Sequence, residues 1–400
     1  MAMLSEDAFP QRGDAMTTRF DVVIVGAGIM GVSTAYHLAR RRIGRIVVVE
    51  RDGVCTGSTA LASGGVRHQY ASRIGIELTC HSIETFERFE TEFGVDPRFH
   101  QHGYLIMVTT DAELGQASIN VALQRSFGVE VELLSPEDTH RRFPYLWTDD
   151  LQGATYSPRD GYADPYLVTT AMAARARELG VEIRTGSEVV GIRTSGARVE
   201  GVTTSEGMLD APAVVLATGA WTGGVGRLAG IDVPVKPLRR SKFITAPFPF
   251  DRIPEATPFV IDPHQGISLR REGAGLLLGI GRRDEAPSFG TEVDWSLTEP
   301  LIERAVRRVP ALADAGLMRG WAGLYEMTPD QTGILSAVPD VPGLYVIAGF
   351  SGHGFMHGPI AGQLMAELIG DGRATTVDIA PLALDRFARG EMTLEPLTFT

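Results

Sequence analysis

The chain has 400 residues and a formal net charge of −12. This length is enough for two domains, and the negative charge opposes binding to nucleic acid, because phosphate binding depends on an excess of Lys and Arg. Cys55 and Cys80 form no C-x-x-C pair, which argues against a disulfide framework and a zinc site. We expect a cytoplasmic protein without a metal centre, and no membrane span, because no apolar run approaches roughly 18 residues. Residues 1–18 are polar and charged, and we predict a flexible tail there.

The first regular element is predicted at residues 20–25, a run rich in Val and Ile that is typical of a buried parallel strand. Gly26, Gly28 and Gly31 follow it at once, and a helical apolar pattern then continues to the basic residues at 40–42. In such a unit the first glycine forms the turn, the second lets the backbone approach a pyrophosphate, and the third lets the helix pack closely on the strand. The unpaired N–H groups of the helix start then face the phosphates.

A second strand is predicted at residues 45–49 and ends at Glu50, nineteen positions beyond Gly31. A carboxylate at that distance accepts hydrogen bonds from the ribose of adenosine and disfavours a 2′-phosphate. The unit therefore predicts a site for NAD or FAD rather than NADP, and the pattern alone leaves these two cofactors open.

The middle of the chain alternates helical patterns with short apolar strands. Ser135 begins "SPED" and predicts a helix start. A buried strand, a glycine and a helix start recur at 211–224, and strand, glycine-rich turn and helix recur at 344–369. The remaining predicted elements are helices over 74–93 and 166–179, strands over 181–184 and 188–192, a hairpin around 199–203, and a strand-dominated region over 233–280.

Nucleotide-type units at the start, middle and end predict an α/β fold with one domain assembled from separated segments. We predict a discontinuous Rossmann-type cofactor-binding domain from residues 19–95, 150–232 and 320–390. A sheet-rich α+β substrate domain, interleaved with it, takes residues 96–149 and 233–319. A ligand between the two domains would be enclosed by both.

Five motifs give the chain a family resemblance. They are "VVIVGAGIMG" from Val22, "GSTALASGGVRHQY" from Gly57, "DGYADPY" from Asp160, "GWAGLYEMTPD" from Gly320 and "GFSGHGF" from Gly349. With them the chain resembles the FAD-dependent amine oxidoreductases of the glycine and D-amino-acid oxidase type, most closely monomeric sarcosine oxidase and the beta subunits of heteromeric sarcosine oxidase and dye-linked L-proline dehydrogenase. The resemblance implies a resident FAD and the oxidation of an amino acid or secondary amine, such as sarcosine, proline or glycine, by hydride transfer to flavin N5, which gives an imine.

The same resemblance implies roles for individual side chains. Arg67 is expected to bind the substrate carboxylate, which suits the fork of a guanidinium. Tyr325 is expected to face the substrate, and His353 to bond the flavin or substrate at the start of a helix whose N–H groups would stabilise reduced flavin. His353 and His357 lack a third partner for a metal. The other expected FAD-binding residues, besides Gly26, Gly28, Gly31 and Glu50, are Ile29, Met30, Arg51, Ser58, Thr59, Ser63, Gly64, Gly65, Val189, Ala217, Thr218, Gly219, Trp221, Gly352, Gly354, Phe355 and Met356.

Four departures from the family pattern shape the expected chemistry. Leu61 and Gly323 stand where relatives carry residues that bond FAD covalently, so we expect non-covalent FAD. Leu277 and Met356 replace two lysines, of which the first is associated with oxygen activation, so a dehydrogenase with another electron acceptor is favoured. An amine oxidase that uses oxygen and makes hydrogen peroxide, and a non-catalytic FAD-bound scaffold or assembly protein, stay open, as does a homo- or hetero-oligomer.

Overall fold

The computed structural model describes residues 18–247, 252–282 and 284–393. The predicted tail lies outside these residues except for Thr18, and there the prediction is wrong. Thr18–Arg19 form β1, which pairs in parallel with β12 (Gly207–Asp210). No helix in these ranges is long and apolar enough to cross a bilayer.

A six-stranded sheet confirms that the start, middle and end of the chain build one layer. Its order is β19-β20-β13-β2-β3-β9, and every neighbouring pair except β19 with β20 is parallel. The Val- and Ile-rich runs are buried along their whole length in β2 and β3, as a parallel sheet covered on both faces requires. The strands are β2 Val22–Val25, β3 Ile46–Val49, β9 Glu182–Arg184, β13 Ala213–Leu216, β19 Ile334–Ala337 and β20 Leu344–Ala348.

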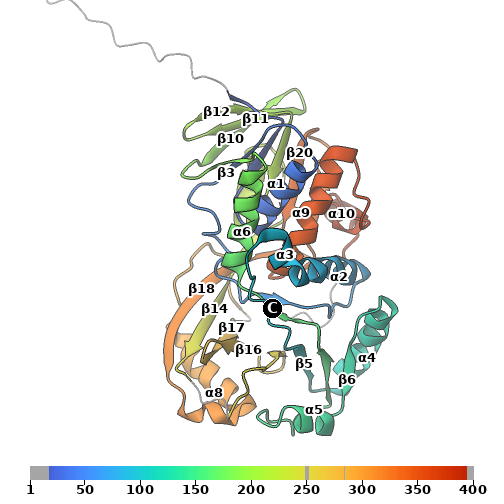
Figure 1. The fold of residues 1–400 in the computed structure, drawn as a ribbon, viewed down its shortest axis with the longest axis vertical. Helices are drawn as coiled ribbons and strands as arrows, with labels where there is room; N and C mark the ends of the chain where they lie inside the picture. Colours follow the sequence, from blue (N-terminus) through green and yellow to red (C-terminus); the bar gives the residue numbers. More distant parts are fainter. Residues whose placement is uncertain (1–17, 248–251, 283, 394–400) are drawn as a thin grey trace, which may run out of the picture.

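Helices α1 (Ile29–Arg40) and α9 (Gly354–Asp371) lie side by side against this sheet, next to α6 (Pro165–Glu178), in the upper half of Figure 1. They can approach closely because a Cβ on Gly358 or Gly362 of α9 would overlap Ile29 or Ser33 of α1. The helix predicted over 74–93 is divided at Arg88 into α2 (Arg73–Glu87) and α3 (Phe89–Phe93).

An eight-stranded sheet fills the lower half of Figure 1, in the order β18-β14-β17-β16-β15-β5-β7-β6. Two of its strands, β7 and β18, belong to segments that the sequence assigned wholly or mainly to the cofactor domain, so the sheet crosses the predicted boundaries; the division into two domains stays a prediction. The strands are β5 Tyr104–Val108, β6 Glu132–Leu134, β7 Gly153–Ser157, β14 Lys236–Thr245, β15 Phe259–Asp262, β16 Ile267–Glu272, β17 Gly275–Ile280 and β18 Leu317–Met327.

Two smaller sheets complete the described chain. The first has the order β1-β12-β11-β10; residues 199–203, where the sequence predicted a hairpin, lie within the single strand β11, which pairs antiparallel with both β10 and β12. The second pairs β4 with β8. Ser135 caps α5 as predicted, because its side chain accepts from Asp138 N. The remaining elements are β4 Gly65–Val66, β8 Gly161–Tyr162, β10 Val189–Ser195, β11 Arg198–Thr204, α4 Asp111–Ser126, α5 Pro136–Arg142, α7 Thr222–Arg227, α8 Thr298–Arg308, α10 Arg386–Arg389, and the short 3₁₀ helices η1 Gly219–Trp221, η2 Trp295–Leu297, η3 Pro310–Asp314 and η4 Ala380–Leu382.

Candidate functional site

A cavity lies at the carboxyl ends of β2, β3 and β13 and extends to β14 and β18 of the eight-stranded sheet. About 390 Å³ of it is open to water-sized molecules. This is where a parallel α/β sheet binds its ligands. The predicted site residues that line the cavity are Gly26, Gly28, Ile29, Met30, Glu50, Arg51, Ser58, Thr59, Val189, Ala217, Thr218, Gly219, Trp221, Tyr325, Gly352, Gly354 and Phe355.

The three glycines of the first turn leave a helix N-terminus open toward the cavity. Gly26 has φ +105°, and a Cβ on it would lie 2.5 Å from the carbonyl oxygen of Ala217. Gly31 does not line the cavity; a Cβ there would overlap the carbonyl oxygen of Gly26, so it sets the packing of α1 on β2. Gly28 caps α1 without a side chain, and the first turn carries no acid. Ile29 N donates to Thr59 Oγ1 (3.3 Å). The N–H groups and the positive end of the helix dipole therefore suit an anion such as a pyrophosphate.

Glu50 stands at the end of β3 on the wall of the same cavity. Its Oε2 accepts from Ala27 N (2.8 Å) and its Oε1 from Asp52 N (2.9 Å), so the carboxylate is fixed beside the glycine turn. The neighbouring Arg51 guanidinium lies 5.0 Å from the ring centroid of Trp221. Trp221 in turn stacks on Phe289, with ring centroids 5.6 Å apart.

The carbonyl of Leu61 ties the segment after Gly57 to two strands of the eight-stranded sheet. Leu61 O accepts from Lys242 Nζ (2.6 Å) and from Trp321 Nε1 (3.2 Å). Opposite Leu61, a Cβ on Gly323 would lie 2.9 Å from the Leu61 Cβ. Burial and the charge of Arg270 lower the pKa of Lys242 to about 7. Lys242, Leu61 and Gly323 all line the cavity.

Ser63, Gly64 and Gly65 were expected at the flavin, but they lie behind the cavity wall. Ser63 O accepts from Arg270 Nε (2.7 Å), and Gly65 pairs with Tyr162 in the β4–β8 ladder. Gly64 has φ +74°, and a Cβ on it would overlap the carbonyl oxygen of Ala163. These small residues therefore allow strand packing, and their contact with a cofactor stays a prediction.

Arg67 is buried, with 5% of its surface exposed, and does not line the cavity. Its Nη2 donates to His353 Nε2 (3.0 Å), its Nη1 donates to Gln69 O, and its guanidinium lies 4.2 Å from the ring centroid of Tyr70. Because a guanidinium can only donate, His353 Nε2 must carry a lone pair. Burial and the charges of Arg67 and His357 lower the pKa of His353 well below its usual range, which agrees with a neutral ring.

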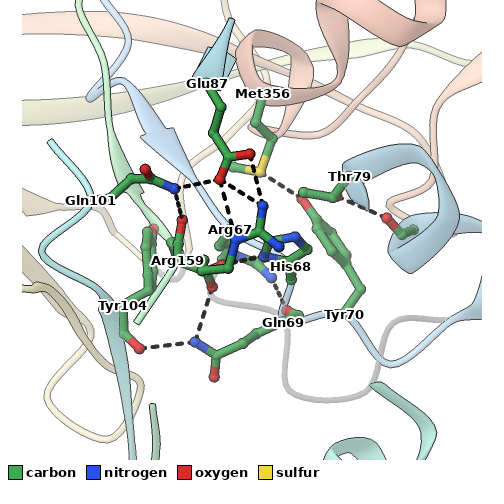
Figure 2. Close-up of polar contacts among 12 residues, drawn as sticks. Arg67, His68, Gln69, Tyr70, Thr79, Glu87, Gln101, Tyr104, Arg159 and Met356 are labelled. Carbon is green, nitrogen blue, oxygen red and sulfur yellow. Dashed lines mark hydrogen bonds and ion pairs between the residues drawn. The ribbon is translucent and has the colours of Figure 1, made fainter. Parts of the chain in front are cut away.

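A buried network positions the segment after β4 that carries Arg67. Asp160 accepts from His68 Nδ1 (2.6 Å) and from His68 N (3.0 Å), and it also accepts from Gln69 Nε2 (3.3 Å). Gln69 Nε2 also donates to Tyr104 O (2.9 Å), as Figure 2 shows. The "DGYADPY" motif thus contributes a positioning carboxylate that sequence reasoning did not single out.

Tyr325 lines the cavity, and its ring lies against Gly352, where a Cβ would be 2.5 Å from the ring. The Arg240 guanidinium is 5.6 Å from the Tyr325 centroid. Burial raises the pKa of Tyr325, so its hydroxyl keeps its proton and can donate. Met356, by contrast, contacts the segment that precedes α2, where its Sδ accepts from Tyr70 Oη (2.9 Å), and it does not line the cavity.

Several lining residues were missed, since no local pattern marks them. The clearest signal was Lys242, one of two lysines in the chain. The missed residues are Val25, Val49, Asp52, Thr56, Gly57, Ser187, Glu188, Val225, Lys242, Phe289, Thr291, Leu324 and Glu326.

A family model described as "FAD dependent oxidoreductase" (DAO) matches residues 21–368. The chain belongs to this family. Human mitochondrial sarcosine dehydrogenase is 31% identical over 372 residues, which are 88% of this chain and 40% of that protein. The chain thus spans about 40% of the length of that relative. Sarcosine oxidase subunit beta of Arthrobacter sp is 30% identical and is covered to 92%, with 93% of this chain aligned. The structure of L-proline dehydrogenase from P. horikoshii has a TM-score of 0.88 and 31% identity, over 94% of this chain and all of that one.

The protein therefore uses FAD, as the family resemblance implied. The cavity fits this cofactor: the uncapped start of α1 suits its pyrophosphate, and Glu50 stands where a ribose hydroxyl would donate. Among the described residues, no three His, Cys, Asp or Glu side chains gather as a metal site would need.

Proposed function

We propose that the protein oxidises an amino acid or a secondary amine. The names of its relatives support this class, because they include sarcosine dehydrogenase, L-proline dehydrogenase and glycine oxidase. The observation that carries the proposal is the buried guanidinium of Arg67 in contact with His353, the residue that begins α9 beside the cavity. Bound FAD would supply the electron acceptor for the oxidation.

Arg67 would hold the carboxylate of the substrate. Its present partners include a backbone carbonyl and a neutral imidazole. A carboxylate gives shorter and stronger charge-assisted bonds than either of these, so it can replace one of them. Tyr325 would donate its hydroxyl proton to the same carboxylate or to the amine. His353 stays neutral beside Arg67 and would help to position the guanidinium.

The direct test is anaerobic mixing with sarcosine, L-proline, glycine and D-alanine while the absorbance of oxidised flavin is followed. We expect at least one of these amines to bleach the flavin completely. A flavin that stays oxidised with all of them, but is bleached by dithionite, would support the scaffold alternative instead.

We further infer that FAD is held without a covalent bond. Leu61 and Gly323 face each other on the cavity wall, and neither side chain carries a group that can bond a flavin. Acid precipitation distinguishes the two cases, because only a non-covalent flavin stays in solution.

An oxidase that uses oxygen is the second candidate, and Lys242 is the observation that favours it. Leu277 stands where the family pattern places a lysine, but Lys242 projects from the same face of the sheet. Ile244 pairs with Leu277, and Lys242 lies two residues from Ile244. A cation at the cavity wall favours electron transfer to oxygen, because it stabilises the negative charge that develops.

Lys242→Met is expected to lower the rate of reoxidation by oxygen about tenfold or more relative to reoxidation by a dye. In the parent protein the rate with oxygen should fall as the pH rises through about 7, where Lys242 loses its proton. Stopped-flow reoxidation checks both, with the exposed Lys236→Met as the matched control. If the ratio of the reoxidation rate with oxygen to that with a dye is the same in Lys242→Met and the parent protein, the dehydrogenase is the better supported function.

The cellular location and the partner subunits of the protein are proposed from its cysteines and from one of its relatives. Cys55 and Cys80 are both free, which supports a cytoplasmic location. Similarity to a protein named as a beta subunit supports a hetero-oligomer, which co-purification of a tagged chain from its native cells would reveal.

A further inference from the structure

Glu326 is a carboxyl group that the functions described above do not use. It is the penultimate residue of β18 and lies on the cavity wall. Its Oε1 accepts from Phe350 N (3.3 Å), and its backbone oxygen accepts from Ser351 N (3.1 Å). Both bonds fix Glu326 to the glycine-rich turn that precedes α9.

The second carboxyl oxygen of Glu326 has no partner. Oε2 is inaccessible to solvent and forms no hydrogen bond with any described residue. A buried carboxyl oxygen without a partner is costly, and the place of Glu326 on the cavity wall favours a bound group as its partner. The side chain as a whole is partly exposed because it borders the cavity.

The surroundings of Glu326 show which part of a ligand would meet it. A Cβ on Gly219, at the start of η1, would lie 3.6 Å from Oε2, and a Cβ on Gly354, at the start of α9, would lie 3.2 Å from Oε1. That Cβ on Gly354 would also lie 3.6 Å from Met30 Cε, in the first turn of α1. Glu326 therefore lies between the helix start that suits the pyrophosphate and the helix start beside the substrate residues.

We propose that Glu326 is a cofactor-binding residue whose Oε2 forms a hydrogen bond with a hydroxyl of the ribityl chain of FAD. The ribityl chain joins the pyrophosphate to the flavin ring, and its hydroxyl groups are its only polar groups. The inference rests on the cavity holding FAD and does not depend on which amine is oxidised.

The same geometry indicates that the bound form of Glu326 is protonated. Burial raises the pKa of Glu326 to about 7, against the opposing effect of the N–H groups of Gly349 and Phe350. The described residues provide no ion pair for Glu326. Its titratable neighbours are Tyr325 on β18 and the neutral His353 at the start of α9. Lys236 on β14 is exposed. An ionised carboxylate would also repel the phosphates of the incoming cofactor. A protonated carboxyl avoids this repulsion and can donate to the hydroxyl oxygen.

Affinity for FAD provides the test. The full-length protein is stripped of flavin and titrated with FAD, with quenching of flavin fluorescence as the readout. We expect Glu326→Leu to weaken binding about 3- to 10-fold, the cost of one neutral hydrogen bond. Glu326→Gln keeps an acceptor for Phe350 N and a donor for the hydroxyl, and it should stay within about twofold of the parent protein. In the parent protein the affinity should fall as the pH rises above about 7, by at most about tenfold per pH unit, and Glu326→Gln should abolish this dependence.

FAD analogues that each lack one ribityl hydroxyl identify the partner by a double-mutant cycle. The loss caused by Glu326→Leu should disappear with one analogue and persist with the others. An equal loss with all analogues, or no loss with FAD, would overturn the proposal.

The melting temperature of the flavin-free protein separates binding from a purely structural role. Glu326→Gln keeps an acceptor for Phe350 N, so its apoprotein should be at least as stable as the parent apoprotein, whereas Glu326→Leu also removes that acceptor and should cost about 1–3 kcal/mol at most. A lower melting temperature accompanied by an equal loss with all analogues would show that Glu326 only supports the turn.

Discussion

Replacing Gly31 by alanine is expected to yield a protein that purifies without its flavin. The added Cβ would overlap the carbonyl oxygen of Gly26, which is backbone and cannot rotate away. Either α1 must shift from β2 or the glycine turn must open, and such overpacking costs about 1–3 kcal/mol or more. Because the N-terminus of α1 forms the wall that suits the pyrophosphate, this shift should weaken FAD binding about ten- to a hundredfold.

The ratio of flavin to protein absorbance after gel filtration measures the loss, and titration with FAD measures the affinity. Gly115→Ala is the matched control, because Gly115 is an exposed residue of α4 and a Cβ there meets no atom within 4 Å. This control should keep its flavin and gain about 0.5–1 kcal/mol of stability from helix propensity. A Gly31→Ala protein with a full complement of flavin would contradict the assignment of the α1 start as the pyrophosphate site.

Replacing Arg67 by alanine should weaken the binding of amino-acid substrates about ten- to a hundredfold, since a hydrogen bond to a charged group contributes about 1.5–3 kcal/mol. Arg67→Lys should recover only part of this affinity, because an ammonium cannot form the two parallel bonds of a guanidinium. Anaerobic reduction of the flavin at a series of substrate concentrations gives the apparent Kd.

A substrate without the carboxylate shows whether the loss arises from that group. If proline reduces the flavin, pyrrolidine is the comparison, and Arg67→Ala should cost it little. Arg88→Ala is the control for removal of an arginine, because the Arg88 side chain is 71% exposed. An unchanged apparent Kd for proline in Arg67→Ala would refute the carboxylate assignment, and equal losses for proline and pyrrolidine would show a structural effect.

Much of the fold could be predicted from the sequence because its signals are local. The apolar run at 22–25 followed by spaced glycines gives strand, turn and helix wherever it occurs, since backbone freedom and side-chain periodicity depend on near neighbours. The same reasoning found β13 and β20 and hence the discontinuous sheet, and it found the start of α5 at Ser135. The motifs also identified FAD and the family.

The tertiary structure decided which distant side chains meet at the cavity. Lys242 reaches Leu61 from a strand 181 positions away, and the orphan oxygen of Glu326 lies beside Gly219. The tertiary structure also placed Ser63, Gly64 and Gly65 behind the cavity wall, although their glycine pattern favoured a flavin contact. Periodicity in a sequence indicates which face of an element is buried, but not which element covers it. Pairing between distant strands and the packing of helix starts determine those contacts, and they exist only in the folded chain.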